Sequence, residues 1–518
     1  MIRVLAVSAP ELPSGGIGFA LTSRDPVSLY NACRYAAFLA ENRVGMWSES
    51  NWAVPRIQRR RSVLLMHSLQ DDLPRFVQAL EEVRPNLLLL GAMTPCLPGA
   101  VACATIAKEM FGDDVCVVLG GRHATETIYH SAGICAGPVA HHHGSPIRLM
   151  AEGLIPLCFD LVIAGEGEHL IPWLGETIGH LEQRGIPCAR VQFHLDGVCD
   201  VPGNWIMSWC DNGDGFTVEG KGIPIDRNTL PIPCDMFGIG TAFDVFDGRL
   251  TAHAFSDTGP GCAFDCNYCS ERRSTAGSLL QLETSATRLY RQLHAAVRVV
   301  AHDSPQQKAS AFVEDSTILA GSVSALKQFV RQLERFPLDI RFGGQLTIDQ
   351  ITSRREILST LKKVGLDYLF IGIETLNPNE IGGMSKDLKQ ATASWKSRID
   401  EVLDLLSSLG IQAGSALLFG LGESVHSREQ LFECLQGWRA RYGMPHPVSI
   451  NWAVQHPLKG EDHGMQYRYH EWGIPDGPFI EAFQGYGEAS ILYPIAGQAR
   501  PTLDEVLHVR AMYESLIS

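Results

Sequence analysis

The sequence lacks any apolar run that could cross a membrane. A spanning helix needs roughly 18 or more apolar residues in a row, and no stretch of the 518 residues approaches that length. An excess of positive charge is also missing, because 43 Lys and Arg face 57 Asp and Glu and give a formal net charge of −14. This balance argues against a nonspecific nucleic-acid coat or an anionic membrane surface, although a local basic groove stays compatible with it. We therefore expect neither a membrane nor nucleic acid among the partners.

The start of the sequence does not have the pattern that predicts a secretory leader. Only Arg3 precedes the short apolar run at the start, and no credible cleavage site follows it. Apart from one cluster of three, the 14 cysteines are scattered, and many stand in strand-like runs such as the one around Cys116. In a large chain without a leader, scattered cysteines are typical of reduced core residues. These features predict a cytoplasmic protein.

Apolar residues are plentiful enough for a large core, at 45% of the chain against 19% charged residues. A chain of this length predicts two or three domains. Over residues 1–184, strand-like runs alternate with helical patterns, which predicts a parallel sheet covered by helices on both faces. The expected strands after the first include 62–68, 86–92, 115–121 and 160–164, and the expected helices include 27–41, 73–83 and 98–111.

Glycine and small polar residues follow three of these strands. Ligands of parallel sheets bind at the carboxyl ends of the strands, and glycine there lets a ligand approach the backbone closely. Each of these features alone is also compatible with an ordinary turn. The candidate cofactor-binding residues are Thr94, Gly120, Gly121, His123, Thr125, Gly165 and Glu166.

Taken in order, the patterns Gly-Gly-x-His-x-Thr and Gly-Glu-Gly-Glu resemble the cobalamin-binding domain that precedes the catalytic domain in one large enzyme family. The resemblance implies that the residues just named contact cobalamin. The sequence lacks the Asp-x-His-x-x-Gly motif by which many cobalamin proteins supply a histidine to cobalt. That absence is common in this family, and it leaves the lower axial ligand open. A domain that binds no cobalamin is the alternative.

Three consecutive histidines, 141–143, invite a metal interpretation. Consecutive side chains point in different directions on a strand or a helix, whereas the ligands of a metal converge on one point. We therefore expect a polar loop at this place.

The cysteine cluster lacks the fourth ligand of a structural zinc site. Cys262, Cys266 and Cys269 form a Cys-x3-Cys-x2-Cys pattern, and the nearest later cysteine is Cys434. Zinc would need further ligands with their own spacing, and a redox Cys-x-x-Cys interpretation leaves Cys262 unexplained. Three cysteines on a short loop can instead hold three irons of a [4Fe–4S] cluster, which leaves the fourth iron open to a chelating ligand.

This pattern, with the aromatic Tyr268 directly before the third cysteine, resembles the signature of the radical S-adenosylmethionine (SAM) superfamily. The resemblance implies that the open iron chelates the amino and carboxylate groups of SAM. One-electron reduction would then yield a 5′-deoxyadenosyl radical. In such a site the cofactor carries the hard chemistry, while the protein orients it and excludes water.

Strand-like and helical patterns repeat downstream of the cysteines. They suit the partial (β/α)6 barrel of radical SAM enzymes over residues 251–460, with its site at the carboxyl ends of the strands. Residues 185–250, rich in Gly, Pro, Asp and Asn, are expected as a linker and lead-in, and residues 461–518 as a small C-terminal cap ending in a helix over 502–517. The predicted fold class is α/β: a Rossmann-like doubly wound cobalamin-binding domain, then this barrel, then the extension.

The resemblance also implies contacts to SAM. Glu314 and Asp315, at the end of the strand expected over 310–316, stand where the superfamily contacts the SAM amino group, although the usual Gly-Gly-Glu is missing. Glu374 resembles the glutamate that reaches the SAM ribose, with a salt-bridged strand end as its structural alternative. The turn with Gly420 and Gly422 resembles the adenine-side loop without its proline, and an ordinary turn is the alternative. The remaining cofactor-binding candidates are Tyr268 and Gln345, and the Met384-Ser385-Lys386 run follows Glu374 as in many cobalamin-type relatives.

The whole resemblance implies a cobalamin-dependent radical SAM enzyme. Its cofactors would be a [4Fe–4S] cluster, SAM and cobalamin, and its commonest activity is methyl transfer to a carbon centre of a small-molecule or peptide natural product. An electron donor of the flavodoxin or ferredoxin type is the implied partner. Two alternatives stay open: a radical SAM enzyme with non-methylation chemistry such as rearrangement, cyclisation, epimerisation or sulfur insertion, and a non-catalytic sensor. No catalytic residue and no substrate is indicated by the sequence.

Overall fold

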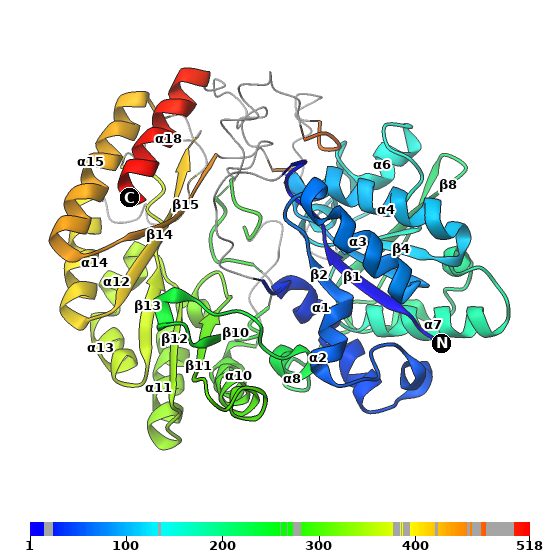
Figure 1. Ribbon diagram of the computed structural model, residues 1–518, viewed down its shortest axis with the longest axis horizontal. Helices are drawn as coiled ribbons and strands as arrows, with labels where there is room; N and C mark the ends of the chain where they lie inside the picture. Colours follow the sequence, from blue (N-terminus) through cyan, green and yellow to red (C-terminus); the bar gives the residue numbers. More distant parts are fainter. Residues whose placement is uncertain are drawn as a thin grey trace. The chain divides into compact units, whose positions relative to one another are not determined.

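The computed structural model has two compact units. Described residues up to Gly238, together with 457 and 468–472, form the first unit, and those from Ile239 to His456, together with 502–517, form the second. Figure 1 labels their helices and strands. The structure describes residues 1–14, 24–132, 136–259, 261–266, 268–272, 281–376, 384, 386, 394–419, 423–452, 456–457, 468–472 and 502–517.

Seven strands make one sheet in the first unit, in the order β2-β1-β3-β4-β7-β8-β9. The first five are parallel, and β8 and β9 run antiparallel to their neighbours. Four consecutive positions are buried in β1, β3 and β4, so these strands have core on both faces, because successive side chains point to opposite sides. The strands are β1 (Val4–Ser8), β2 (Val63–Leu65), β3 (Leu87–Gly91), β4 (Cys116–Gly120), β7 (Leu161–Gly165), β8 (Trp205–Asp211) and β9 (Asp214–Glu219).

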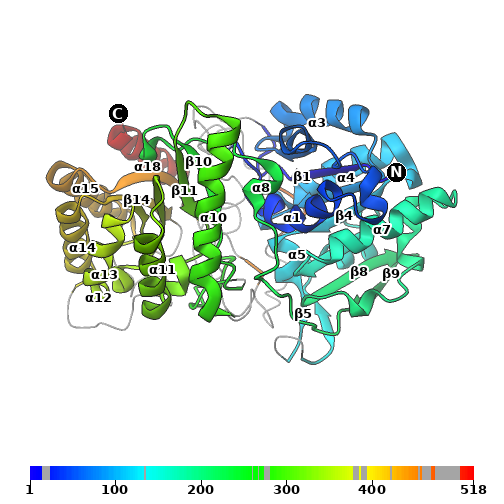
Figure 2. The same cartoon turned by 90° about the horizontal axis from the view of Figure 1, so that it is seen from below.

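Helices cover both faces of this sheet (Figure 2). Side chains of α1 (Val27–Glu41) and α7 (Leu170–Gln183) share a buried cluster with alternate strand residues such as Val4 and Leu87. The intervening strand residues point to the other face, where α3 (Leu69–Val83) and α4 (Leu97–Phe111) contact the sheet. The predicted α/β class with a parallel sheet is confirmed.

A hairpin in the predicted linker extends this sheet. Residues 185–250 contain β8 and β9, joined at Asn212 and Gly213, which both have positive φ. Asn-Gly favours this two-residue turn because asparagine and glycine tolerate such angles best. Trp205 and Met207 of β8 are buried in the core of the first unit, which is why the segment joins the sheet. The four-part domain division stays a prediction.

Six parallel strands make the sheet of the second unit, in sequence order from β10 to β15. The carboxyl ends of all six therefore lie at one edge, where the residues that follow each strand are brought together. The strands are β10 (Leu250–Ala254), β11 (Ala309–Val313), β12 (Ile340–Gln345), β13 (Leu366–Phe370), β14 (Gln412–Phe419) and β15 (His446–Trp452).

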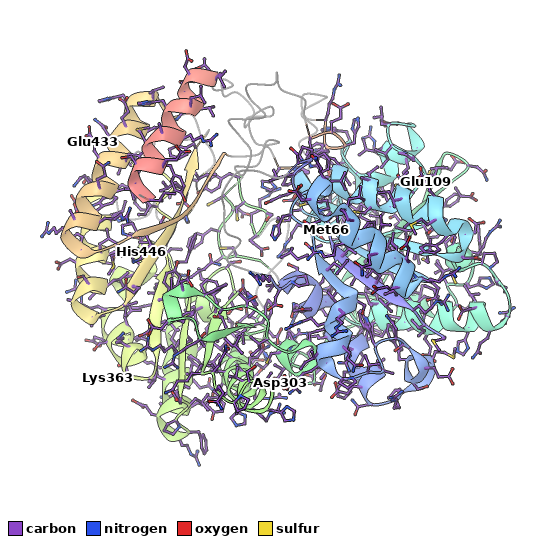
Figure 3. The ribbon with its side chains drawn as sticks, in the orientation of Figure 1. Met66, Glu109, Asp303, Lys363, Glu433 and His446 are labelled. Atoms are coloured by element: carbon purple, nitrogen blue, oxygen red, sulfur yellow. The ribbon has the colours of Figure 1, made fainter. Side chains whose placement is uncertain are left out.

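Helices alternate with the strands of the second unit, and Figure 2 shows α10 and α11 beside β10 and β11. Charged side chains such as Lys363 and Glu433 lie on the outer faces of these helices (Figure 3). The helix expected at the C-terminus is present and packs on α15. Among the described helices none is both long and apolar enough to cross a membrane. The helices are α10 (Leu282–Asp303), α11 (Val323–Arg335), α12 (Ile348–Ser353), α13 (Arg355–Lys363), α14 (Trp395–Leu409), α15 (Val425–Tyr442) and α18 (Leu503–Ile517).

Candidate functional site

The cysteine loop follows β10 and is tied together by its own backbone. The Cys262 N–H donates to the Glu271 carbonyl at 2.7 Å, and the Cys269 N–H donates to the Cys266 carbonyl at 3.1 Å. The Glu271 N–H also points to the Cys269 Sγ, at 3.4 Å. The sequence prediction of one compact loop with three thiols matches this local geometry.

Two side chains hold the backbone that leads into this loop. The Asp315 carboxylate, directly after β11, accepts hydrogen bonds from the Ser256 N–H at 3.0 Å, from the Ser256 hydroxyl and from the Leu319 N–H at 3.2 Å. From α10, the Arg288 guanidinium donates to the carbonyls of Ser256 and Asp257 at 3.1 and 2.9 Å. The start of the cysteine loop is therefore fixed from a strand end and from a helix.

The three thiols suit a cluster better than a single metal ion. Among the residues that the structure describes, no three His, Cys, Asp or Glu side chains converge as a one-ion site would require. A [4Fe–4S] cluster takes one thiolate on each of three irons, so its ligands need not meet at one point. Burial raises the pKa of the Cys262 thiol, and raises that of Cys269 to about 11. Binding of metal must therefore displace protons from these thiols.

Glu374 lies beyond the carboxyl end of β13 with an unusual backbone. Its φ is +53°, a left-handed conformation that costs a non-glycine residue of order 1–3 kcal/mol and is typical of functional sites. One carboxylate oxygen accepts a hydrogen bond from the Lys386 Nζ at 2.7 Å. The other, Oε2, is shielded from solvent and has no hydrogen-bond partner among the described residues. This oxygen is available to a ligand with a hydrogen-bond donor.

Lys386 and Tyr268 connect Glu374 to the cysteine loop. Burial raises the pKa of the Tyr268 hydroxyl, and the nearby Glu374 carboxylate and Cys266 raise it further. The Lys386 cation acts in the opposite direction on Cys262, whose pKa it lowers against the effect of burial. A Cβ at Gly372 would overlap the Lys386 amine and the Glu374 Oε1, so any larger residue there would displace this pair. Tyr268 and Lys386 are thus each within electrostatic reach of both Glu374 and a cysteine of the loop.

The other predicted SAM contacts have different surroundings. The Glu314 carboxylate lies 2.6 Å from the Nδ1 of His253. The Asp315 carboxylate accepts the hydrogen bonds from Ser256 and Leu319 described above. Burial raises its pKa to about 6. Gln345 ends β12 and is half-buried. Gly420 and Gly422 lie outside the described residues. Direct contact of these residues with SAM stays a prediction.

In the first unit, the predicted cofactor residues bind one another. The Thr94 hydroxyl, after β3, donates to Glu126 Oε2 at 2.8 Å and lies 3.2 Å from the His123 Nδ1. Glu126 was not among the predicted cofactor-binding residues. The sequence feature that could have indicated it is its place three residues after His123, in the short helix α5 (Arg122–Thr127). The Thr125 hydroxyl accepts a hydrogen bond from the Gly165 N–H at 3.1 Å, which ties the ends of β4 and β7 together.

Two predicted glycines are required by the backbone around them. A Cβ at Gly121, where φ is +95°, would lie 2.6 Å from the Ala92 carbonyl oxygen, and one at Gly165, where φ is +89°, would overlap the Asn204 carbonyl. Gly120 has no such close neighbour, because a Cβ added there would lie 3.8 Å from the Ile163 carbonyl oxygen. The Glu166 carboxylate forms an ion pair with Arg227 and accepts the Asn204 N–H at 2.9 Å.

Two of the three histidines, His142 and His143, lie in a loop as predicted, but their rings pack around an aromatic ring. His141 ends β6 (Val139–His141), and the His142 Nδ1 accepts the Gly144 N–H at 3.1 Å. The buried ring of Tyr469 lies 5.6 Å from the His142 ring and 5.4 Å from the His143 ring. Expected in a polar loop, His142 is only 3% exposed, because Tyr469 covers it. No sequence signal indicated Tyr469, which is far away along the chain.

Comparison with known proteins defines the class. Residues 257–435 match the Radical SAM superfamily, and the cysteine loop, Glu374 and β10–β14 all fall within or beside this match. The residues of this match form a radical SAM domain. The cofactors of that domain are a [4Fe–4S] cluster and SAM, as the cysteine pattern predicted.

Two known proteins are similar to more of the chain than the superfamily match covers. The chain is 23% identical over 390 residues to the hopanoid C-3 methylase of Methylococcus capsulatus (strain ATCC 33009 / NCIMB 11132 / Bath), a match that covers 75% of this chain and 62% of that protein. Its fold is similar to that of TsrM from Kitasatospora setae, a radical SAM methyltransferase whose structure holds cobalamin and a [4Fe–4S] cluster. The TM-score is 0.50 at 13% identity, over 89% of this chain and 77% of TsrM. The predicted relationship to the radical SAM superfamily is confirmed over residues 257–435, and the likeness to TsrM is one of fold.

Proposed function

We propose that the protein is a cobalamin-dependent radical SAM methyltransferase that acts on a carbon centre of a small-molecule or peptide natural product. The observation that carries the proposal is Glu374 at the carboxyl edge of the second sheet: it pairs with Lys386, it lies near Tyr268 of the cysteine loop, and its Oε2 has no hydrogen-bond partner among the described residues. Methylation is supported by the two relatives, a methylase and a methyltransferase.

We assign the second unit to the partial (β/α)6 barrel and give its residues these roles. Cys262, Cys266 and Cys269 would hold three irons, and a cluster with SAM supplies a one-electron cleavage that makes a carbon radical. Asp315 and Arg288 hold the entry of the cysteine loop in place. Glu374, kept in one orientation by Lys386, offers Oε2 to a donor group of the ligand. The half-buried loop limits access of water to this edge.

The first unit would hold cobalamin, which supplies the methyl group. Gly121 and Gly165, both with positive φ, let the chain turn at the carboxyl ends of β4 and β7, the edge at which parallel sheets bind their ligands. His123 does not suit a role as cobalt ligand, because both ring nitrogens contact protein atoms, Thr94 Oγ and the Gly144 carbonyl. We keep the predicted boundaries 1–184, 185–250, 251–460 and 461–518 as a proposal, with a cytoplasmic location and a flavodoxin- or ferredoxin-type electron donor.

Anaerobic purification followed by iron, cobalt and SAM-cleavage assays tests the proposal. We expect uptake of cobalamin and of a [4Fe–4S] cluster, with release of 5′-deoxyadenosine and S-adenosylhomocysteine under reducing conditions. Failure to bind cobalamin would contradict methyl transfer and favour the non-methylation alternative. Absence of both SAM products from a protein that carries its cluster would contradict an enzymatic role.

A further inference from the structure

The strand β14 ends beside the carboxylate that the second unit offers to a ligand. Leu417 of β14 forms a parallel bridge with Glu374, whose Oε2 has no hydrogen-bond partner among the described residues. Phe419, the last residue of β14, is 1% exposed and stacks on Phe432 of α15, with the ring centroids 5.9 Å apart. The position of α15 therefore bears on the backbone next to Glu374.

A buried ion pair lies at the start of α15. Glu423 directly precedes Ser424, the N-cap residue of this helix, and is 7% exposed, while Arg428 within the helix is 6% exposed. The Arg428 Nε donates to Glu423 Oε1 at 3.2 Å, and its Nη2 donates to the Glu423 carbonyl at 3.3 Å. The planar fork of arginine suits such a two-point contact. One guanidinium thus binds both the side chain and the backbone of Glu423.

The C-terminal helix brings a second carboxylate to Arg428. Glu505 lies in the first turn of α18, and its Oε1 is 3.9 Å from the Arg428 Nη1. Its Oε2 accepts the Thr502 N–H at 2.8 Å, and the Glu505 N–H donates to the Thr502 hydroxyl at 3.3 Å. This reciprocal arrangement is a capping box. It orients the Glu505 side chain, so less rotamer freedom is lost in the contact with Arg428.

Apolar packing holds α18 on α15 independently of this contact. Figure 1 shows the two helices side by side. Four α18 side chains are at most 6% exposed: Val506, Val509, Tyr513 and Leu516. Their burial contributes far more free energy than one ion pair whose glutamate side chain is 30% exposed. The contact between Glu505 and Arg428 therefore serves to orient the arginine, and the helix stays in place without it.

We propose that Arg428 is a positioning residue of the site at the carboxyl edge of the second sheet, and that α18 supports it through Glu505. A guanidinium bound from two sides is fixed in one orientation, whereas one bound from a single side regains rotamer freedom. Loss of Glu505 should therefore loosen the backbone of Glu423. The inference rests on the proposed function, because it gives the C-terminal helix a part in the binding of SAM at this edge.

Hydrogen exchange of the full-length protein, followed by mass spectrometry without SAM, tests the positioning. In Glu505→Gln we expect peptides that cover residues 423–428 to exchange about threefold faster than in the wild type. His508→Gln is the matched control: the His508 Nε2 lies 2.9 Å from Glu429 Oε1 across the same two helices, and both side chains are exposed. Equal exchange in the two variants would overturn the proposal, whether or not the protein binds SAM.

Calorimetric titration of SAM into the cluster-loaded enzyme tests the service to the site. We expect Kd to rise about threefold in Glu505→Gln and about tenfold in Arg428→Lys, which keeps the charge but loses the fork. His508→Gln should bind SAM as the wild type does. A merely structural ion pair would alter exchange and leave Kd unchanged in both variants, and that result would overturn the proposal.

The wild-type enzyme separates this inference from the proposed function. If it holds its cluster and binds no SAM, the proposed function fails and the inference fails with it. If it binds SAM, and Glu505→Gln and His508→Gln bind equally well, the proposed function stands and the role of α18 is contradicted. If Arg428→Lys does not fold, Glu505→Gln and its control decide.

Discussion

The two sheets end in carboxyl edges of different character. At the edge of the first unit, the Thr94 hydroxyl lies within hydrogen-bond distance of both His123 and Glu126, and all three residues are almost completely buried within helix and turn backbone of ordinary conformation. At the edge of the second unit, Glu374 holds a left-handed backbone and keeps one carboxylate oxygen without a hydrogen-bond partner among the described residues. A motif at a strand end can therefore mark either a scaffold that shapes a site or a group that contacts the ligand. Only the hydrogen-bond geometry distinguishes the two.

Removal of a cysteine should have the largest effect at the second edge. We expect Cys266→Ala to abolish binding of the cluster and with it all cleavage of SAM, because three thiolates are needed to leave a single open iron. Iron content and the visible spectrum of the reconstituted protein measure the loss. The control is Cys434→Ala, since Cys434 is half-buried in α15 and away from the loop in sequence. Equal iron content in the two variants would show that Cys266 does not hold the cluster.

Asp315 should make the stability of the second unit depend on pH. Its pKa in the folded protein is about 6, against an ordinary value of 3.8, because burial disfavours the charged carboxylate. The folded state then binds the proton more tightly than the unfolded state. Protonated Asp315 therefore stabilises the folded state below about pH 4, and this stabilisation is lost as the pH rises through about 6. The free energy of unfolding should fall by up to about 3 kcal/mol in total.

The variant Asp315→Asn isolates this contribution. Asparagine cannot ionise, so the variant lacks this dependence on pH. Relative to the variant, the wild type should lose up to about 3 kcal/mol of its free energy of unfolding as the pH rises from about 4 to about 7. Denaturant unfolding at several pH values measures it. A difference that stays constant across this range would show that Asp315 does not titrate there.

The first edge should respond through stability rather than through ligand contact. We expect Thr94→Val to lower the free energy of unfolding by about 2–3 kcal/mol, because it leaves His123 and Glu126 without their shared partner inside the protein. Thr177→Val is the matched control, since the Thr177 hydroxyl donates only to the Trp173 carbonyl of its own helix, at 3.1 Å. Equal effects of the two substitutions would mean that the buried contacts of Thr94 contribute nothing beyond an ordinary hydroxyl.

Much of the difference between the two sheet edges was predictable from the sequence, and the part that was not predicted has a physical reason. The buried strands β1, β3 and β4 follow from continuous apolar runs, and the three cysteines from their spacing. The cover provided by Tyr469 was not predictable, because its contact with His123 joins residues 346 positions apart (469 − 123) and has no periodic signal. The hairpin of β8 and β9 was missed although Asn212 and Gly213 favour such a turn. Composition outweighed that signal, because glycine and aspartate around the turn suggested a linker.

The smallest effect should come from Lys386, which orients the Glu374 carboxylate whose Oε2 has no hydrogen-bond partner among the described residues. We expect Lys386→Gln to weaken binding of SAM to the cluster-loaded enzyme about tenfold, equivalent to about 1.4 kcal/mol, because a charge-assisted hydrogen bond no longer holds the carboxylate. Lys362→Gln is the control: Lys362 binds Asp367 at the same distance, 2.7 Å, but at the start of β13, opposite to the site. Lys386→Arg should restore most of the affinity. If the two glutamine variants bind SAM equally well, the ion pair does not serve the site, and the open oxygen of Glu374 must be oriented by its backbone alone.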